Sequence, residues 1–541
     1  MCENALMSST PSSHVDTVPA RSSGGAGALL VAAGIFLSRI AGLVRQRVFA
    51  HYFGQSDAGD AFTAAFRIPN FLQNLFGEGV LSASFIPVYS KLLARGDEEG
   101  ARRVAGVVAS VLATVTSALV LAGVLATPLL VDTIAPGFEG EKRELTVRLV
   151  RILFPGTGLL VLSAWCLGIL NSHRRFFLSY AAPVLWSAVM IAGMVAAGSS
   201  ASGAGMAVVL AWASVLGSAL QFAIQLPSVL RLAPGLRPSL DLRDEGSRTV
   251  LRTFGPVFVG RGVVQISSYV DSMIASFLPS GAVTALANAQ VLYTLPVSLF
   301  GMAVSAAELP AMSSLIGDRD EVALALRGRL DAGLGRVAFF IVPSAMAFLA
   351  LGDVIAAALF QTGRFGAADA RWVWGILAGS SVGLLASTLG RLYSSTFYAM
   401  HDTRTPLRCA TLRVLVGTTL GWFASLHLPA IVGVDPKWGV AFLTASSGAA
   451  GWLEFLLLRR TLHGRIGRTG IAPASLASLW AAAALSAGLG LVAKHLAGAE
   501  VHPLLLAAAV LTPYGLTYFA ATFALGIPES RSLLRRFAPK K

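Results

Sequence analysis

The sequence predicts an all-α polytopic membrane protein with about fourteen transmembrane helices, and three observations lead to this prediction. First, 55% of the 541 residues are hydrophobic and only 13% are charged, with a mean hydropathy of +0.69. Second, the apolar runs are long enough to cross about 30 Å of hydrocarbon. Third, lysines and arginines gather in alternate loops, as they do in cytoplasmic loops. The net charge of +14 is therefore ascribed to these loops rather than to nucleic-acid binding.

Taken in chain order, the apolar runs predict fourteen helices. The first seven cover residues 26–53, 59–93, 102–131, 146–171, 178–198, 203–229 and 249–278. The next seven cover residues 282–314, 327–350, 371–400, 404–425, 436–459, 472–496 and 503–527. Residues 1–25 are polar and Ser-rich and predict a disordered tail, whereas residues 528–541 predict a basic tail. The apolar run 26–37 lacks a basic segment before it and a convincing cleavage site after it, so we expect it to be retained.

The basic residues also predict the orientation of the chain in the membrane. One set of loops is rich in Lys and Arg, and it lies near residues 91–103, 174–175, 231–248, 319–327, 404–408 and 459–468. The alternate loops are poorer in basic residues and hold Lys142, Arg143, Arg364, Lys437 and Lys494. The positive-inside rule then places both termini in the cytoplasm, which requires an even number of helices. Fourteen satisfies this requirement, and twelve is disfavoured because the last two runs are long and apolar.

An internal repeat predicts two halves with the same orientation. The segment with IPN, LFGEGV and FIP in the first half of the chain is matched in the second half by TLPVSLFGMAV and ELP. A second pair of similar segments is LNSHRRFFLSYAAP and FYAMHDTRTPLRCA. We therefore expect an N-lobe over 26–230 and a C-lobe over 249–460, with a substrate site between them. The alternative is that two apolar segments are similar by chance, but the Pro and Phe-Gly matches occur in the same order in both halves and disfavour it.

Polar side chains follow one face of the second predicted helix. A helix advances about 100° per residue, so a set of five polar residues projects within roughly an 80° sector. The set is Asp60, Arg67, Asn70, Asn74 and Glu78. In the first helix, Ser38 and Arg45 share a face, and Arg39 is adjacent to Ser38. Charge inside a membrane is costly and marks functional sites, so we expect these two helices to line a wet cavity.

The backbone of the same region contains breakers that predict hinges. Pro69 falls inside the second helix, where it removes a hydrogen bond and should kink the helix. Gly77 and Gly79 flank Glu78 and loosen the backbone there. We expect Pro69, Gly77 and Gly79 to act as the hinge of a broken helix.

Basic groups outnumber acidic groups in this polar stripe. The basic members are Arg39, Arg45, Arg47 and Arg67, and the acidic members are Asp60 and Glu78. Unpaired cations at membrane depth indicate an anionic ligand. The alternative is that the charges pair with one another and only hold helices together.

Further polar residues extend the candidate site into the second half. Arg261 and Asp271 lie on nearly one face of the seventh helix, and Thr284 and Asn288 share a face of the eighth. An ion pair with a neighbouring helix is the alternative for Arg261 and Asp271. A hydrogen bond to its own backbone is the alternative for Thr284.

Signals of catalysis are absent from the sequence. It has no G-x-x-x-x-G-K-[ST] and no H-E-x-x-H. Cys2, Cys166 and Cys409 make neither a disulfide framework nor a zinc spacing. We therefore expect a transporter that is not an enzyme and holds no cofactor or metal. Without a nucleotide site, transport would be driven by membrane potential or by a proton or sodium gradient.

The quoted residues resemble a known family. SRIAGLVRQRVFAHYFG and DAFTAAFRIPNFLQNLFGEGVLSASFIPVYS resemble the first two helices of the MurJ (MviN) lipid II flippases of bacteria. That family belongs to the multidrug/oligosaccharidyl-lipid/polysaccharide exporter superfamily. The resemblance extends over nearly the whole chain, including ILNSHRRF and LFQTGRF. It implies two lobes around a cationic cavity and a groove for the undecaprenyl tail at helices 13 and 14 (residues 472–527). It also implies that the protein lies in the bacterial inner membrane and takes part in peptidoglycan biosynthesis and in maintaining cell shape.

The resemblance also carries over individual residues. Positions that matter for function in the family are matched here by Ser38, Arg39, Arg45, Asp60, Asn70 and Glu78. Arg67 matches a basic position that is often Lys. Two positions depart from the pattern, because Gln73 and Val291 stand where family members have Arg. One expected diphosphate ligand is thereby missing, and we hypothesise that Arg261 replaces it.

The resemblance, together with the cationic stripe, implies a flippase that moves lipid II to the outer leaflet by alternating access. Arg39, Arg45, Arg67 and Arg261 would bind the diphosphate and acidic headgroup. Asp60 and Glu78 would pair with those arginines when the site is empty. The partners would be lipid II, the bilayer and cell-wall synthesis proteins, without nucleic acid. Three alternatives remain: a flippase for another polyprenyl-diphosphate glycan, an ion-coupled drug antiporter, for which an acid-rich cavity is expected, and a scaffold without transport.

Overall fold

The computed structural model describes residues 24–537 except 77, 202, 316–317 and 499–500, and nearly all of its elements are helices. The first bundle comprises α1 (Gly24–Phe53), α2 (Asp57–Phe76), α3 (Glu78–Ala94), α4 (Glu98–Leu125), α5 (Thr127–Ile134), α6 (Gly140–Ser172), α7 (Phe176–Ala197) and α8 (Gly203–Leu232). A long α9 (Glu245–Ala275) follows. The remaining helices are α10 (Ala282–Pro296), α11 (Ala303–Ser313), α12 (Arg319–Phe360), α13 (Ala367–Ala399), α14 (Arg404–Leu426), α15 (Leu428–Val432), α16 (Gly439–Ile466), α17 (Pro473–Ala497), α18 (Pro503–Ala524) and α19 (Pro528–Phe537).

Every predicted membrane span falls on a helical segment. Among the described residues, eleven segments are long and apolar enough to cross a membrane. The three predicted spans outside that group are α1, α2 with α3, and α9. These three segments carry most of the charged residues of the candidate site. The all-helical, polytopic fold class is therefore confirmed.

Two predicted helices are interrupted in the structure. The span 102–131 divides into α4 and α5, whereas 59–93 is covered by α2 and α3 on either side of residue 77, which lies outside the described residues. The span 282–314 contains a π-helical turn, Val297–Met302, between α10 and α11. The hydroxyl of Thr127 donates to the carbonyl of Gly123 over 2.7 Å and so satisfies one backbone group at the α4–α5 break. Such breaks are tolerated at membrane depth when neighbouring groups satisfy the freed backbone.

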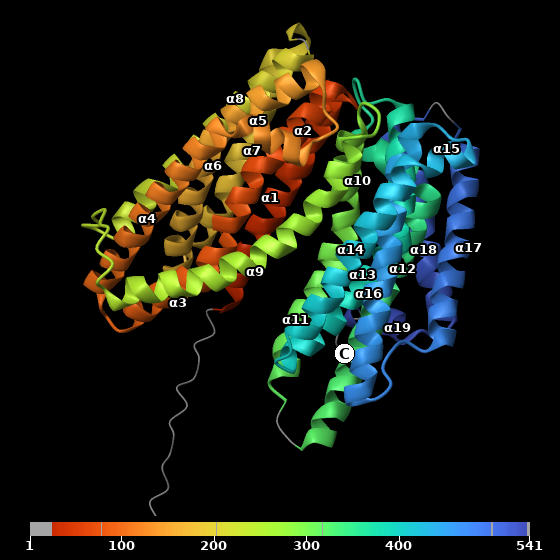
Figure 1. The fold of residues 1–541 in the computed structure, drawn as a ribbon. Helices are drawn as coiled ribbons and strands as arrows, with labels where there is room; N and C mark the ends of the chain where they lie inside the picture. Colours follow the sequence, from red (N-terminus) through yellow and green to blue (C-terminus); the bar gives the residue numbers. More distant parts are fainter. Residues whose placement is uncertain (1–23, 77, 202, 316–317, 499–500, 538–541) are drawn as a thin grey trace, which may run out of the picture.

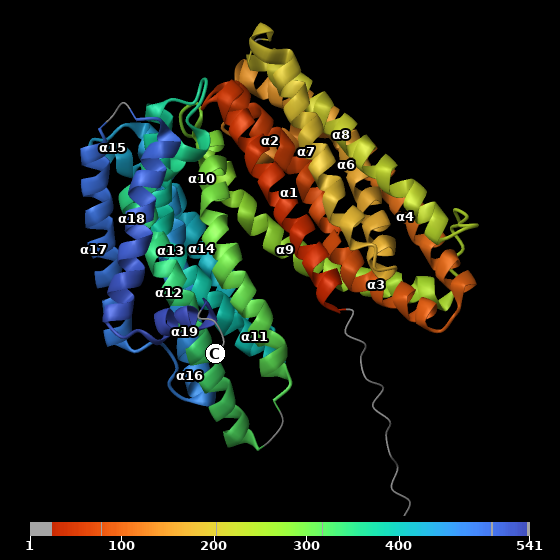
Figure 2. The same cartoon turned by 180° about the vertical axis from the view of Figure 1, so that it is seen from behind.

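The helices form two bundles that are joined by α9 (Figure 1). Helices α1 to α8 form one bundle and helices α10 to α19 form the other, and α9 packs on α3 as well as on α14. Figures 1 and 2 show the ribbons of the two bundles close together where α2 and α10 begin. The ribbons diverge toward the opposite end, where α3 and α11 end. We call these the joined end and the splayed end.

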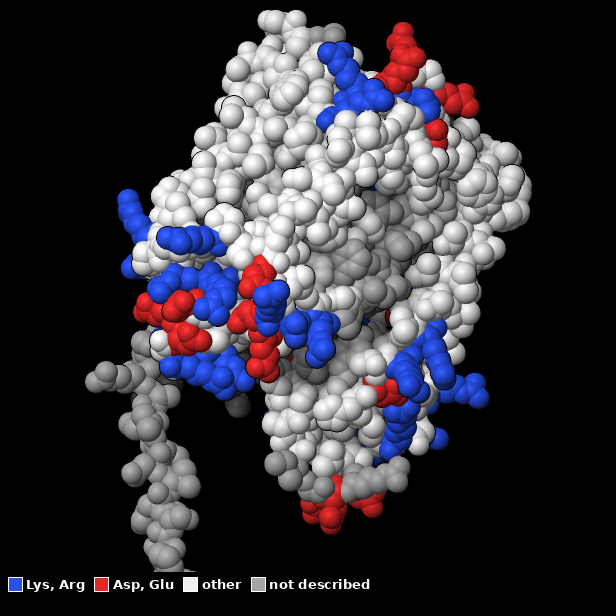
Figure 3. All heavy atoms as spheres, turned by 60° about the vertical axis from the view of Figure 1, so that its left-hand side comes forward, with Lys and Arg blue, Asp and Glu red and all other residues white. Residues whose placement is uncertain are grey.

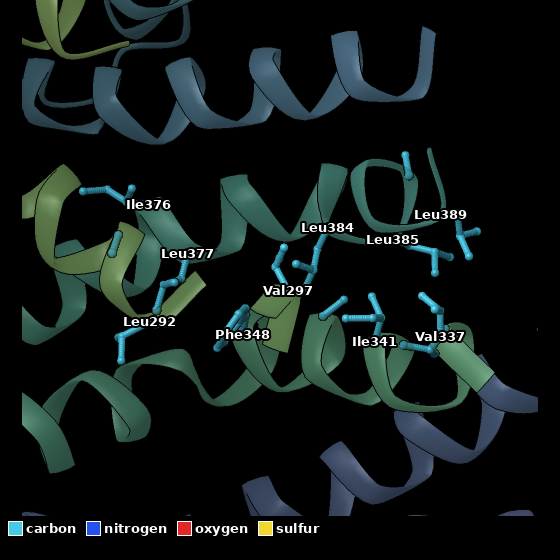
Figure 4. Packing of buried hydrophobic residues seen from close by; sticks show 14 of the residues in the cluster. Leu292, Val297, Val337, Ile341, Phe348, Ile376, Leu377, Leu384, Leu385 and Leu389 are labelled. Atoms are coloured by element: carbon cyan, nitrogen blue, oxygen red, sulfur yellow. The ribbon is translucent and has the colours of Figure 1, made fainter. Parts of the chain in front are cut away.

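The second bundle contains the largest apolar core. In this core Val297 of the π-helical turn lies beside Leu384 of α13, and Leu292 of α10 lies near Leu377 (Figure 4). Helix α13 also packs closely on α16. A Cβ added at Gly383 of α13 would lie 2.3 Å from the Cα of the glycine that it faces on α16. Small residues let membrane helices approach this closely.

The surface agrees with a membrane protein. Figure 3 shows charged side chains gathered toward two ends of the molecule, with a broad uncharged belt between them. Large apolar side chains face outward on both bundles, including Leu125 (73% exposed) and Leu496 (80% exposed). An exposed apolar surface of this extent is explained by contact with lipid.

Candidate functional site between the two bundles

Side chains of α1 and α2 reach across to α10 and the π-helical turn that follows it. Arg39 Nη1 donates to Ser298 Oγ over 3.2 Å. Gln46 Nε2 donates to the buried Asn288 Oδ1 over 2.7 Å. Arg67 Nη2 lies 3.4 Å from the side-chain oxygen of Gln290. The structure therefore brings residues of the predicted stripe to the boundary between the bundles, although their partners lie in the other half of the sequence.

Arg45 turns toward α7 in its own bundle. Its guanidinium carbon lies 4.4 Å from the ring centroid of Trp186, and Nη1 lies 3.8 Å from the sulfur of Met190. A cation over an indole face is favourable where water is scarce. Trp186 was not singled out from the sequence, because it lies far from Arg45 in the chain, on a helix without charge of its own. It holds Arg45 without neutralising its charge.

Four arginines of the stripe form no salt bridge among the described residues, although Asp271 acts electrostatically on one of them, Arg67; the four are Arg39, Arg45, Arg47 and Arg67. The ion pairs of the described chain involve other arginines, for example Arg336 with Glu308 at 2.7 Å and Arg413 with Glu454 at 3.1 Å. Arg47 of α1 instead donates to the carbonyls of Ala358 and Leu359. The arginine side chains at the bundle boundary thus retain capacity for an anion.

Asp60 is held differently from the prediction that it would pair with arginines of the stripe. In the structure its carboxylate accepts from Lys142 Nζ at 2.7 Å and from the amides of Gly281 and Thr284 at 2.8 Å each. These two amides belong to the start of α10, where backbone donors are free and the helix dipole favours an anion. Asp60 lies in the first turn of α2, and therefore beside α10 and Lys142. The predicted arginine pairing is not formed in this structure.

Further contacts near Asp60 tie the bundles together. His51 Nδ1 lies 2.8 Å from Thr362 Oγ1, and the carbonyl of His51 accepts from the amide of Arg364 over 2.9 Å. Gln55 Nε2 donates to the carbonyl of Asp369 over 3.2 Å. The joined end is thus closed by direct hydrogen bonds from α1 and the α1–α2 turn to the loop before α13 and the first turn of that helix.

The remaining predicted residues are placed at different depths. Ser38 and Asn70 are half-buried, and Asn74 is exposed. Thr284 and Asn288 are buried, and Asn288 Nδ2 has no partner among the described residues.

Two residues of α9 form hydrogen bonds near the site. Asp271 accepts from Ser447 Oγ over 3.1 Å, whereas Tyr269 donates to the carbonyl of Arg67 over 3.0 Å. Pro69 is buried inside α2. Gly77 lies outside the described residues, as do the side chains of Glu78 and Arg261, whereas Gly79 belongs to the first turn of α3.

The described residues offer no group of three or more His, Cys, Asp or Glu side chains that could hold a metal ion. What the arrangement offers is cationic and amide donors on the facing sides of two bundles. Guanidinium groups bind phosphate oxygens with two parallel hydrogen bonds. The geometry suits binding of an anionic group between the two bundles.

The fold is that of a class of polytopic membrane proteins with two helical bundles. A solved structure titled lipid II flippase MurJ in an inward closed conformation matches with a TM-score of 0.73 over 94% of this chain and 100% of its own, at 24% identity. A multidrug resistance MATE family transporter in an inward-facing conformation matches with a TM-score of 0.62 over 81% of this chain and 98% of its own, at 17% identity. Both comparisons concern the fold.

Sequence comparison identifies the family within this class. Residues 49–511 match the family model described as lipid II flippase MurJ, and the chain belongs to this family of transporters. The lipid II flippase MurJ of Burkholderia cenocepacia is 33% identical over 80% of this chain and 82% of its own length. The probable lipid II flippase MurJ of Rhizobium meliloti is 31% identical over 92% of this chain and 93% of its own length.

Proposed function

We propose that this protein moves lipid II, the undecaprenyl-diphosphate-linked peptidoglycan precursor, from the cytoplasmic to the periplasmic leaflet by alternating access. Membership of the lipid II flippase family supports the substrate. The observation that favours the mechanism is that Arg39 and Arg67 reach across to the other bundle without forming a salt bridge among the described residues, and that Arg45 beside them rests on Trp186. A diphosphate is the part of this lipid that such a site would hold.

The splayed end would face the cytoplasm and the joined end the periplasm. Basic residues support this orientation, because the loops at the splayed end are the Arg-rich ones near residues 91–103, 174–175, 231–248, 404–408 and 459–468. Both chain termini would then be cytoplasmic. A headgroup could enter between the diverging bundles from the side where lipid II would be loaded.

The site residues would act in sequence during transport. Arg39, Arg45 and Arg67, with Arg261 from α9, would bind the diphosphate and acidic headgroup, and Ser38, Asn70, Asn74 and Glu78 would complete the cavity wall. Asp271, Thr284 and Asn288 would contribute polar groups from the second half of the chain. Pro69, Gly77 and Gly79 would absorb the bending of α2 and α3. The polyprenyl tail would stay in the bilayer beside residues 472–527.

Asp60 would have a separate role in closing the periplasmic side. Its bonds to Lys142 and to the start of α10 close the joined end. Opening toward the periplasm would break these bonds, and their return would reset the empty protein. This step needs no nucleotide and would be driven by membrane potential or an ion gradient.

Complementation tests the proposal. Cells depleted of their own lipid II flippase would receive the wild type, Arg39→Ala, Arg45→Ala, Arg67→Ala or Glu78→Ala, with membrane abundance measured for each. We expect rescue by the wild type and loss of rescue by equally abundant arginine variants. Arg408→Ala, which removes an exposed arginine from α14, is the matched control and should rescue.

Two other results would redirect the proposal. A well-expressed wild type that fails to rescue would indicate a different polyprenyl-diphosphate glycan or a drug antiporter. Rescue by all arginine variants would return these charges to a structural role and would agree with a scaffold that does not transport.

A further inference from the structure

One hydrogen-bonded turn occurs twice in the protein, once in each bundle. The turn after α6 has amide-to-carbonyl bonds from His173 to Ile169, from Arg174 to Asn171 and from Arg175 to Leu170. The turn after α13 repeats all three bonds, and its donors and acceptors are Met400 to Thr396, His401 to Tyr398 and Asp402 to Phe397. Arg174 and His401 are also the two non-glycine residues of the described chain with positive φ, 59° in each case. Position 175 in the first bundle therefore corresponds to position 402 in the second.

In the second bundle this position supplies a carboxylate. Asp402 accepts from the amides of Arg404 and Thr405 over 3.0 Å each, and it pairs with Arg465 at 2.7 Å. Hydrogen bonds from Thr405 and the Arg465 guanidinium hold the pKa of the Asp402 carboxyl well below its usual range, so the group is an anion. Arg465 is the penultimate residue of α16.

In the first bundle the cations are present and the carboxylate is not. Arg231 is the penultimate residue of α8, and it corresponds in this respect to Arg465 of α16. Arg231 lines the same pocket as the turn after α6. In that turn, Arg175 occupies the position that Asp402 has in the second bundle. The structure places Arg174, Arg175 and Arg231 around this one pocket of about 500 Å³. No acidic residue lines the pocket, and none of the three guanidinium groups has an ion pair among the described residues.

We propose that this pocket binds the phosphate of an anionic phospholipid, which takes the place that the Asp402 carboxylate has in the second bundle. The occupant is assigned to a phospholipid because one wall of the pocket is apolar. Phe177 (58% exposed), Leu178 and Leu232 lie beside the arginines, where acyl chains would follow the headgroup. A soluble anion would gain nothing from this wall.

The depth of the pocket agrees with a headgroup. Helix α7 has 22 residues, which corresponds to about 33 Å, and the hydrocarbon of a bilayer is about 30 Å thick. The pocket lies at the first turn of α7, and therefore at the boundary between hydrocarbon and headgroups. Basic pockets between membrane helices at this level recognise anionic headgroups.

Native mass spectrometry of the purified full-length protein can test this site. Dioleoyl-phosphatidylglycerol is titrated against dioleoyl-phosphatidylcholine for the wild type, the double variant Arg174→Gln with Arg231→Gln, and Arg408→Gln. We expect the double variant to weaken the first phosphatidylglycerol binding event about tenfold, which corresponds to about 1.4 kcal/mol. Phosphatidylcholine binding should not change, and Arg408→Gln, an exposed arginine of the second bundle, should behave as the wild type.

A charge reversal gives a second, independent test. Arg175→Asp copies the second-bundle turn into the first and supplies the missing carboxylate from the chain itself. We expect it to abolish the same phosphatidylglycerol binding event while the unfolding temperature in detergent stays equal or rises. Because the changed side chains are exposed, a folded variant is expected.

Several results would overturn the proposal. They are unchanged phosphatidylglycerol affinity in the double variant, an equal loss in Arg408→Gln, or retained binding in Arg175→Asp. Loss of undecaprenyl diphosphate binding with phosphatidylglycerol binding intact would also overturn the assignment to a phospholipid. None of these readouts depends on lipid II transport, so they are separable from the complementation result.

Discussion

At the level of single residues, the molecule treats its buried charges in two ways. Asp60 is completely buried and fully bonded, because Lys142 and two amides satisfy its oxygens. Arg45 has an aromatic face and a sulfur atom but no carboxylate among the described residues. The Asp60 carboxylate, whose hydrogen-bond partners are all in the protein, helps to close the joined end. The Arg45 guanidinium, which has no carboxylate partner among the described residues, remains able to bind an anionic ligand.

Asp60 provides the residue-level prediction. Asp60→Ala should weaken the joined end by about 2 kcal/mol, because bonds to a charged group are lost and buried donors are left without an acceptor. Spin labels at the exposed Leu129 and Ile431, on α5 and α15, should then show a larger population of long distances by pulsed electron resonance.

Asp57 supplies the control for this measurement. It pairs with the same Lys142 at 2.9 Å, but its side chain is 61% exposed. Exposed pairs contribute little, so Asp57→Ala should leave the distance distribution nearly unchanged. Equal distributions for the two variants would mean that Asp60 does not hold the bundles together.

At the level of elements, sequence reasoning located the helices better than their interruptions. Apolar length is a local property, and each of the fourteen predicted spans falls on helix. The π-helical turn at Val297–Met302 lies at the Pro296 and Phe300-Gly301 signals of the repeat, but these signals do not predict its form. Its form depends on neighbouring helices, since a Cβ added at Gly301 would meet Thr388 of α13.

The same limit applies to the candidate site. The stripe on α2 could be read from helical spacing, and its members do reach α10. The partners Lys142 and Trp186 could not be found, because each lies on a different helix, far along the sequence from Asp60 and Arg45. Only the packing of α6 and α7 brings them together.

The contact of α13 with α16 provides the element-level prediction. Gly383→Ala should destabilise the protein by about 1 to 3 kcal/mol, because the added methyl overlaps backbone atoms of Gly448 and forces two packed helices apart. Thermal unfolding in detergent measures this change as a lower unfolding temperature.

Gly451→Ala is the matched control on α16. A Cβ at Gly451 meets nothing within 4 Å, and Ala favours a helix over Gly by about 1 kcal/mol. We therefore expect an unchanged or higher unfolding temperature. If Gly383→Ala were equally well tolerated, the close approach of these helices would not matter for stability.

At the level of the whole molecule, the contacts between the bundles are concentrated at one end. The joined end has hydrogen bonds from His51, Gln55 and Asp60, whereas the ribbons diverge at the other end (Figure 1). Rigid bundles that meet in this way can exchange which end is closed by rocking about the middle of the interface.

Covalent locking of the joined end provides the whole-molecule prediction. In a background without the native cysteines, Gln55→Cys with Asp369→Cys should be joined by a short thiol crosslinker, because Gln55 donates to the carbonyl of Asp369 over 3.2 Å. We expect crosslinked cells to lose complementation, since the joined end can no longer open.

The single-cysteine variants are the controls and should complement with or without the reagent. Crosslinked protein that still supports growth would contradict a cycle in which the bundles separate at this end. The crosslinking yield is measured by gel mobility after the chain is cleaved between the bundles, because crosslinked halves stay together. This yield distinguishes a reaction that failed from a crosslink that formed but did not impair growth.

The joined end has a consequence for how this protein can evolve. Many of its bonds use main-chain groups, including the amides of Gly281, Thr284 and Arg364 and the carbonyl of His51. A main-chain donor survives almost any change of side chain at its position. Mutations can therefore change many side chains of the joined end without breaking these main-chain hydrogen bonds. An inhibitor that binds the main-chain atoms of this end would contact groups that resistance mutations can displace but cannot remove.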